Sequence, residues 1–193
     1  SYFPGAGWTG QPLLVKWPTD TKQAMKLPAA AVADANFVEV IYPVFDGSVY
    51  RLSLADGSVT RPKIEGKWGF KGTGSIDPRG YPLLYAGQGL NENGNDKGPW
   101  NYHIFDLIQN KEVATISGTD EVSHRQDPVG WGAFDSSALV DRASDTLVEP
   151  GENGFHPGFG FGLAEAEPLQ PEGDIVTHDW QDDLVLRILE DEA

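Results

Sequence analysis

The chain contains no cysteine among its 193 residues. Disulfides, thiolate metal ligands, haem attachment through Cys-x-x-Cys-His and cysteine nucleophiles are therefore excluded. No apolar run approaches the roughly 20 residues that a membrane-spanning helix needs, so no membrane span is expected. Basic residues are few, because 14 Lys and Arg stand against 29 Asp and Glu and give a formal net charge of −15. Nucleic-acid backbones are bound by clustered Lys and Arg, so this balance argues against a nucleic-acid partner.

Catalytic motifs are also scarce. The sequence has no Gly-x-Ser-x-Gly elbow and thus no sign of a serine hydrolase of that type. No two histidines stand at a metal-ligand spacing such as His-x-x-x-His, which argues against zinc. His103 alternates within an apolar run, which favours a packed or rim residue over a catalytic one. The glycines of residues 158–162 lack the spacing and the following Lys-Ser/Thr of a phosphate-binding loop.

Residues 40–60 contain the clearest local structure. Two alternating apolar runs flank Asp46-Gly47, and a second turn follows at Asp56-Gly57. Asp-Gly between such runs predicts β-hairpins with type I′ turns. Alternation along the second run puts Tyr50, Leu52 and Leu54 on the face that we expect to point inward.

The same strand-turn-strand unit recurs along the chain. An offset of 64 residues superposes Asp77 on Asp141 and Leu83 on Leu147. Repeated meanders of this kind predict an all-β fold, a partial β-propeller of about three blade-like antiparallel meanders. We expect strands at residues 13–16, 38–43, 48–54, 75–76, 83–86, 102–107, 111–116, 138–140 and 146–149.

One segment interrupts the β pattern. Residues 19–35 are rich in alanine and poor in β-branched residues, which predicts a helical insertion packed outside the sheet. Thr19 or Asp20 is a suitable residue to cap its start. Pro28 divides the segment, so we expect two short helices rather than one.

Three stretches carry a resemblance to a known family. Residues 40–60, with an apolar strand, Asp-Gly and Tyr-x-Leu, resemble the repeat of pyrroloquinoline-quinone-like (PQQ-like) β-propellers. Residues 134–141 are similar to the Ser-Ser-Pro-x-Val start of a strand in that family, with Ala138 in place of proline. Residues 72–89 are similar to bacterial extracytoplasmic members. The resemblance covers residues 8–154 and implies an extracytoplasmic or secreted location. The Gly-Lys-x-x-Trp pattern that closes a blade in the family is not kept, since Thr60 leads to Arg61.

The repeat pattern ends near residue 154. We therefore expect two regions, the PQQ-like blades at 1–154 and an atypical acidic tail at 155–193. The tail holds ten acidic residues and one basic residue, Arg187. Its composition favours a loosely ordered acidic tail. The alternative is that the apolar run at residues 183–190 docks on the body as a strand or a terminal helix.

Three blade-like units are fewer than the ~4–8 that close a propeller ring. Open sheet edges are then expected at the strands of Leu13 and Leu147, and such edges recruit partners. We expect them to pair with a second copy through self-association, with further blades, or with residues 183–190.

Two groups of residues are candidate sites. Trp68, Trp100 and Trp131 lie in Gly- and Pro-rich connections, where they either stack on a ligand or staple neighbouring blades. Residues Asn91, Asn93, Asn95 and Asp96 alternate oxygen donors around a glycine turn, which suits Ca²⁺; an ordinary hairpin loop has the same composition.

Two functions from different classes are consistent with these features. The first is a non-catalytic propeller module, a scaffold that binds a protein, glycan or cell-envelope partner. The alternative is a fragment of a quinone-dependent dehydrogenase or another propeller enzyme, which needs a set of metal-binding carboxylates and a stacking tryptophan.

Overall fold

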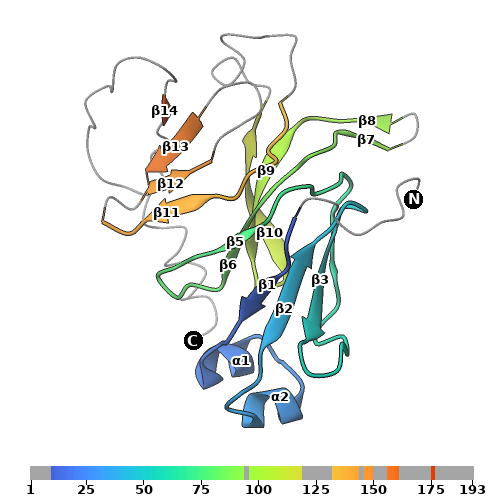
Figure 1. Cartoon of the computed structure of the whole chain (residues 1–193), viewed down its shortest axis with the longest axis vertical. Helices are drawn as coiled ribbons and strands as arrows, with labels where there is room; N and C mark the ends of the chain where they lie inside the picture. Colours follow the sequence, from blue (N-terminus) through green and yellow to red (C-terminus); the bar gives the residue numbers. More distant parts are fainter. Residues whose placement is uncertain are drawn as a thin grey trace.

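The computed structural model describes residues 10–93, 96–118, 132–143, 146–149, 156–160 and 175–176. These residues form an all-β protein with two short helices (Figure 1). The strands assemble into three four-stranded sheets and one small hairpin. Each of the nine predicted strands is confirmed, and each predicted boundary lies within one residue of the observed one.

Sheet 1 is a four-stranded antiparallel meander. Its strands are β1 (Leu13–Val15), β2 (Glu39–Pro43), β3 (Ser48–Ser53) and β4 (Ile64–Glu65), in the spatial order β1-β2-β3-β4. Strand β1 lies at an edge, as expected for the strand of Leu13. Strand β4 was not expected from the sequence.

The two predicted helices are confirmed as α1 (Thr19–Ala24) and α2 (Ala29–Ala33), which lie at the lower end of sheet 1 (Figure 1). A proline precedes each, and neither Thr19 nor Asp20 caps α1. Instead, the buried Lys22 joins the helices, because its Nζ donates to the Ala31 carbonyl at 3.0 Å. Neither helix has the length and hydrophobicity needed to cross a bilayer.

The turn at Asp46-Gly47 differs from the predicted type I′. Only Gly47 has a positive φ, at 83°. Its N–H donates to the Val44 carbonyl at 3.0 Å, and the Asp46 carboxylate accepts from the Ser48 N–H at 2.8 Å. This is a three-residue loop with a glycine bulge. The aspartate carboxylate binds the backbone directly, so a second left-handed residue is not required.

The predicted facing of β3 is wrong. Val49 and Arg51 are buried, as is Ser48 at the start of the strand, whereas Leu54, expected inside, is 52% exposed. Arg51 reads as solvent-facing in the sequence, but it lies between sheets 1 and 2. Its Nη2 donates to the Pro62 carbonyl at 2.5 Å and also to Asn110. Alternation of residue types identifies the two faces of a strand. Which face is buried depends here on Asn110, the partner of Arg51 in the neighbouring sheet.

Sheet 2 repeats the architecture of sheet 1. Its strands are β5 (Ser75–Ile76), β6 (Leu83–Gly87), β9 (Asn101–Asp106) and β10 (Lys111–Ser117), again an antiparallel meander. Between β6 and β9 the chain forms a small hairpin. Its strands are β7 (Glu92–Asn93) and β8 (Asp96–Lys97), neither of which was predicted.

Sheet 3 contains β11 (Leu139–Asp141), β12 (Thr146–Val148), β13 (His156–Gly160) and β14 (Ile175–Val176). Strand β13 pairs antiparallel with β12 and parallel with β14. The strand of Leu147 is therefore not an open edge, and the sheet continues past residue 154. The predicted docking segment, residues 183–190, lies outside the described residues.

Sheet 2 lies between the other two sheets, and this position explains why all five residues of β6 are buried. Leu84, Ala86 and Phe105 belong to a core shared with sheet 1 and the helices. Leu83, Tyr85 and Ile104 belong to a second core shared with sheet 3. Each sheet thus packs face to face on the next along the chain.

The segments that precede the first strand of each sheet also contact one another through their backbones. A Cβ on Gly10 would lie 2.5 Å from the carbonyl oxygen of Gly72, and one on Gly72 would lie 2.3 Å from that of Asp135. Each of these residues precedes the first strand of its sheet. The absence of a side chain at Gly10 and Gly72 therefore allows the three sheets to converge along one line.

Candidate functional site

A cavity of about 360 Å³ lies between the outer strands of sheets 1 and 2; we call it the inter-sheet groove. One wall is β4 with the segment that follows it, and the other is formed by β9 and β10. The lining residues are Lys63, Ile64, Glu65, Gly66, Lys67, Trp68, Phe70, His103, Phe105, Asn110, Lys111 and Glu112.

His103 is held in this groove by its aromatic neighbours. Its ring stacks on Phe105 with centroids 5.7 Å apart and meets the edge of Phe70 at 5.6 Å. His103 and Phe105 alternate on β9 with Tyr102 and Ile104, which face sheet 3. The two-residue period of a strand therefore places the imidazole on the side of the groove.

Both ring nitrogens of His103 face oxygen atoms. Nδ1 lies 2.5 Å from Glu112 Oε2, and Nε2 lies 3.2 Å from Gln88 Oε1. The Gln88 side-chain nitrogen, Nε2, donates to the Pro99 carbonyl at 2.5 Å. This bond fixes the amide so that its oxygen faces His103. The ring is thus held in one orientation from two sides.

The approach of Glu112 to His103 depends on the connection between β9 and β10. The Asp106 carboxylate accepts from the N–H groups of Ile108 and Gln109 at 2.7 and 3.1 Å, a common way for aspartate to stabilise a turn. Asn110 then adopts φ of 60°, which asparagine tolerates. A register shift between Glu112 and Ala114 follows, and such a bulge re-aims side chains.

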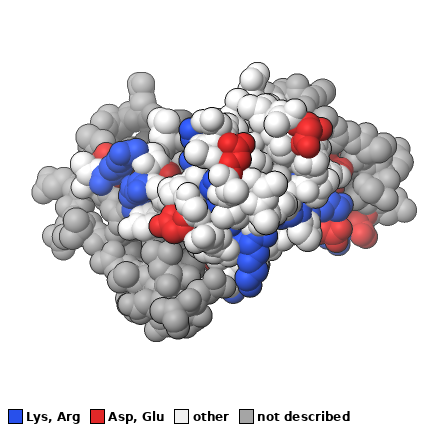
Figure 2. Space-filling model, turned by 90° about the horizontal axis from the view of Figure 1, so that it is seen from below, with Lys and Arg blue, Asp and Glu red and all other residues white. Residues whose placement is uncertain are grey.

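Three lysines make the groove locally cationic within an acidic chain. Lys63 precedes β4, Lys67 follows it and Lys111 begins β10, whereas the lining acids are Glu65 and Glu112. Lys63 lies 3.4 Å from Glu65, and both side chains are partly or largely exposed. Exposed pairs of this kind contribute about 0–1 kcal/mol, so a ligand anion can replace the carboxylate. On the face shown in Figure 2, acidic and basic side chains are interspersed.

The structure places the predicted tryptophans as follows. Trp68 lines the groove but is largely buried, and a Cβ on Gly98 would lie 2.4 Å from its indole. Trp100 is also buried, and Trp131 lies outside the described residues. The contact with Gly98 favours stapling for Trp68, which thereby joins the end of sheet 1 to the β7–β8 hairpin. A ligand contact of these tryptophans stays a prediction.

The predicted calcium residues lie in the β7–β8 hairpin. Asn91 closes the base of this hairpin, since its Nδ2 donates to the Gly98 carbonyl at 3.0 Å. Asn93 pairs with Asp96 in the ladder, and Asp96 lies 3.6 Å from Lys67. Asn95 lies outside the described residues. Within the described residues, no three His, Asp or Glu side chains are clustered to hold a metal.

The groove is not predicted from the sequence. Nothing in the sequence pairs His103 with Glu112, which follows nine residues later across a turn. The pairing of two strands around residues 107–110 was readable from the sequence. The bulge at Val113 and the approach of Lys63 from another sheet were not, because both depend on tertiary packing.

No protein-family model matches the chain, and no curated protein sequence matches it either. Inferences about its function therefore rest on the geometry of the described residues.

Proposed function

We propose that the chain is a non-catalytic module of the PQQ-like β-propeller type. In this proposal its partner is an acidic glycan of the cell envelope, bound in the inter-sheet groove outside the cytoplasm. Three face-to-face four-stranded sheets support the propeller assignment. Propellers commonly carry their binding sites on the surfaces and loops around a rigid scaffold.

The clamped imidazole is the observation that carries the binding role. A general base needs a ring nitrogen within reach of the substrate proton, and both nitrogens of His103 already face oxygens. The same clamp rigidifies the groove floor. A rigid floor lowers the entropic cost of binding.

The chemistry of the walls favours an acidic sugar. Lysine ammonium groups donate charge-assisted hydrogen bonds to a carboxylate or phosphate. Asn110, Glu65 and Glu112 offer partners for sugar hydroxyls, and the edges of Trp68 and Phe70 are apolar. A cavity of about 360 Å³ is at the lower end of the ~300–1,000 Å³ of small-ligand sites.

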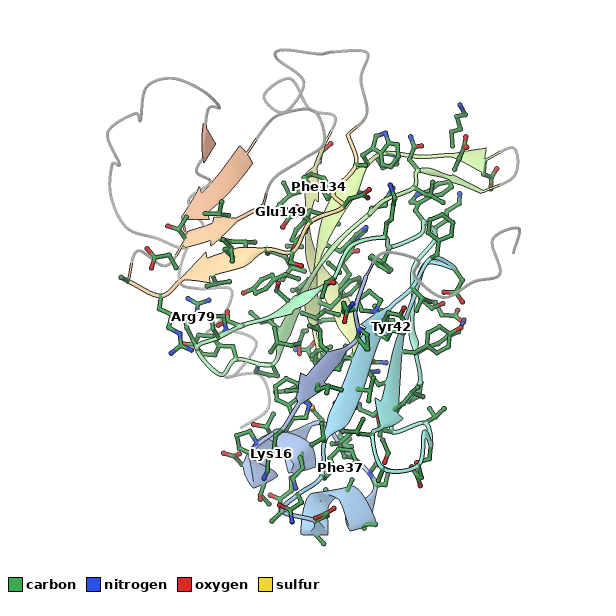
Figure 3. All side chains as sticks on the ribbon, viewed as in Figure 1. Lys16, Phe37, Tyr42, Arg79, Phe134 and Glu149 are labelled. Atoms are coloured by element: carbon green, nitrogen blue, oxygen red, sulfur yellow. The ribbon has the colours of Figure 1, made fainter. Side chains whose placement is uncertain are left out.

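Calorimetric titration with acidic and neutral oligosaccharides of equal length tests this proposal. We expect the acidic ligand to bind more tightly, and added salt to weaken it. Lys63→Gln and Lys111→Gln should each weaken binding about tenfold, since a hydrogen bond to a charged group contributes ~1.5–3 kcal/mol. Lys16→Gln is the matched control, because Lys16 lies beside the helices (Figure 3).

Equal binding of neutral and acidic sugars would contradict the proposal, as would an equal loss of affinity in the Lys16→Gln control. The dehydrogenase alternative has a separate readout. Saturable binding of quinone in the presence of Ca²⁺, accompanied by dye reduction, would replace the module with an enzyme.

A further inference from the structure

Sheet 1 carries an apolar face that no described residue covers fully. Leu14, Val40, Leu52 and Val59 stand opposite one another across the strands and form a continuous row. Leu14 is 60% exposed and Val59 is 66% exposed, at the two ends of this row. Four apolar side chains in line, two of them largely in water, are typical of an interaction surface.

A second row borders the first. Tyr42 pairs with Tyr50 across β2 and β3, and Figure 3 labels Tyr42 on this part of sheet 1. Lys63 lies near the Tyr50 ring at 5.7 Å, and next to it Glu65 is exposed. We call these two rows the outer face of sheet 1. An apolar centre with an aromatic row and a charged border resembles the make-up of protein interfaces.

Sheet 2 shows how the equivalent row is used within the chain. Ile76, Leu84 and Phe105 stand opposite one another on β5, β6 and β9, and all three pack toward sheet 1. Leu14, Val40 and Leu52 occupy the same strand positions in sheet 1. The outer face of sheet 1 thus corresponds to the face of sheet 2 that packs against sheet 1.

Sheet 3 has a face of the opposite kind that no other described strand covers. Val140 packs toward sheet 2, in the core that contains Leu147. Its neighbour Leu139 points the other way, pairs with Val148 and is 71% exposed. We call Leu139 and Val148 the outer face of sheet 3. This outer face corresponds to the face of sheet 2 that carries Tyr85 and Ile104, against which sheet 3 packs.

We propose that two copies of this chain associate head to tail, with the outer face of sheet 1 on one copy packed against the outer face of sheet 3 on the other. The two faces are of the unlike kinds that already pack together inside the chain. Contacts between unlike faces form a ring when the rotation closes. Two copies supply six four-stranded sheets, and ~4–8 such sheets close a radial array.

Light scattering coupled to size exclusion tests the association with the full chain at micromolar concentrations. The expected mass is that of two chains. Leu14→Glu and Leu139→Glu should each shift the protein to one chain, because each puts a charge into both contacts. Leu14→Val keeps the row apolar and should leave the mass at two chains. Ala30→Glu adds the same charge at an exposed position of α2 and should also have no effect.

Mixing distinguishes head-to-tail packing from a symmetric contact. A mixture of Leu14→Glu and Leu139→Glu chains forms one unaltered contact, so the mass of two chains should return. Circular dichroism and melting curves of each variant exclude unfolding as the cause. The proposal would be overturned by a wild-type protein with the mass of one chain. It would also be overturned by a Leu14→Glu variant with the mass of two chains, or by a mixture with the mass of one chain.

Discussion

Glu149 is a carboxylic acid in surroundings that disfavour its charged form. It is fully buried where sheet 3 meets sheet 2 (Figure 3), and its Oε1 accepts a hydrogen bond from Ser136 Oγ at 2.9 Å. Burial raises the pKa of this carboxyl to about 8, although the hydrogen bond from Ser136 opposes the rise. A carboxyl in such surroundings is protonated over much of the range in which free glutamate is ionised.

This pKa predicts a specific dependence of stability on pH. The unfolded chain ionises Glu149 near its ordinary value of 4.5, whereas the folded chain ionises it only near 8. The stability that Glu149 provides below pH 4.5 is therefore lost as the pH rises to about 8. Glu149→Gln removes this loss, so the variant should gain stability relative to the wild type between pH 5 and pH 8.

Urea unfolding at pH 5, 6.5 and 8 measures the difference. We expect the two proteins to be closest at pH 5 and the variant to be ahead by at least about 1 kcal/mol at pH 8, since one pKa unit corresponds to ~1.4 kcal/mol. A gap that is constant across the three pH values would show that Glu149 does not titrate as its burial implies.

At the scale of elements, the sequence predicts position better than orientation. Apolar alternation and Asp-Gly turns located all nine expected strands, because both are local properties. The predicted inward face of β3 was wrong. Arg51 is buried because it finds its partners, Pro62 and Asn110, only in the folded chain. The groove was missed for the same reason, since Lys63 and Glu112 come from different sheets.

The convergence of the first strands gives a prediction at this scale. Gly72→Ala places a Cβ 2.3 Å from the Asp135 carbonyl oxygen. The neighbour is backbone, so relief requires sheets 2 and 3 to move apart. Overpacking of this kind costs about 1–3 kcal/mol, and denaturant unfolding measures it.

The matched control is Gly57→Asn. Gly57 has φ of 72° and nothing within 4 Å of the position of a Cβ, and asparagine tolerates this backbone. The control should change the free energy of unfolding by less than about 0.5 kcal/mol. Equal losses in both variants would indicate a general glycine effect and not a close approach of two sheets.

For the whole molecule, the important departure from the sequence pattern is β13. The repeat fades after residue 154, yet His156–Gly160 pairs with β12 and covers what was expected to be an open edge. Its Gly-rich composition has low strand propensity. Pairing with a strand already in place compensates, and a single sequence does not reveal such a partner. The boundary at 154 thus remains a prediction.

Two shortened chains isolate the contribution of β13. The chain 1–160 keeps the pairing of Leu147 with Phe159, and the chain 1–155 loses it. In hydrogen exchange we expect the amides of Thr146–Val148 that bond to β13 to be protected in 1–160. In 1–155 they should exchange at least about tenfold faster, because an unpaired edge exposes its N–H groups to water. Amides of β9 lie inside sheet 2 and should exchange equally in both chains. If Thr146–Val148 stayed protected in 1–155, another segment or a second copy would cover this edge, and β13 would add little to the stability of sheet 3.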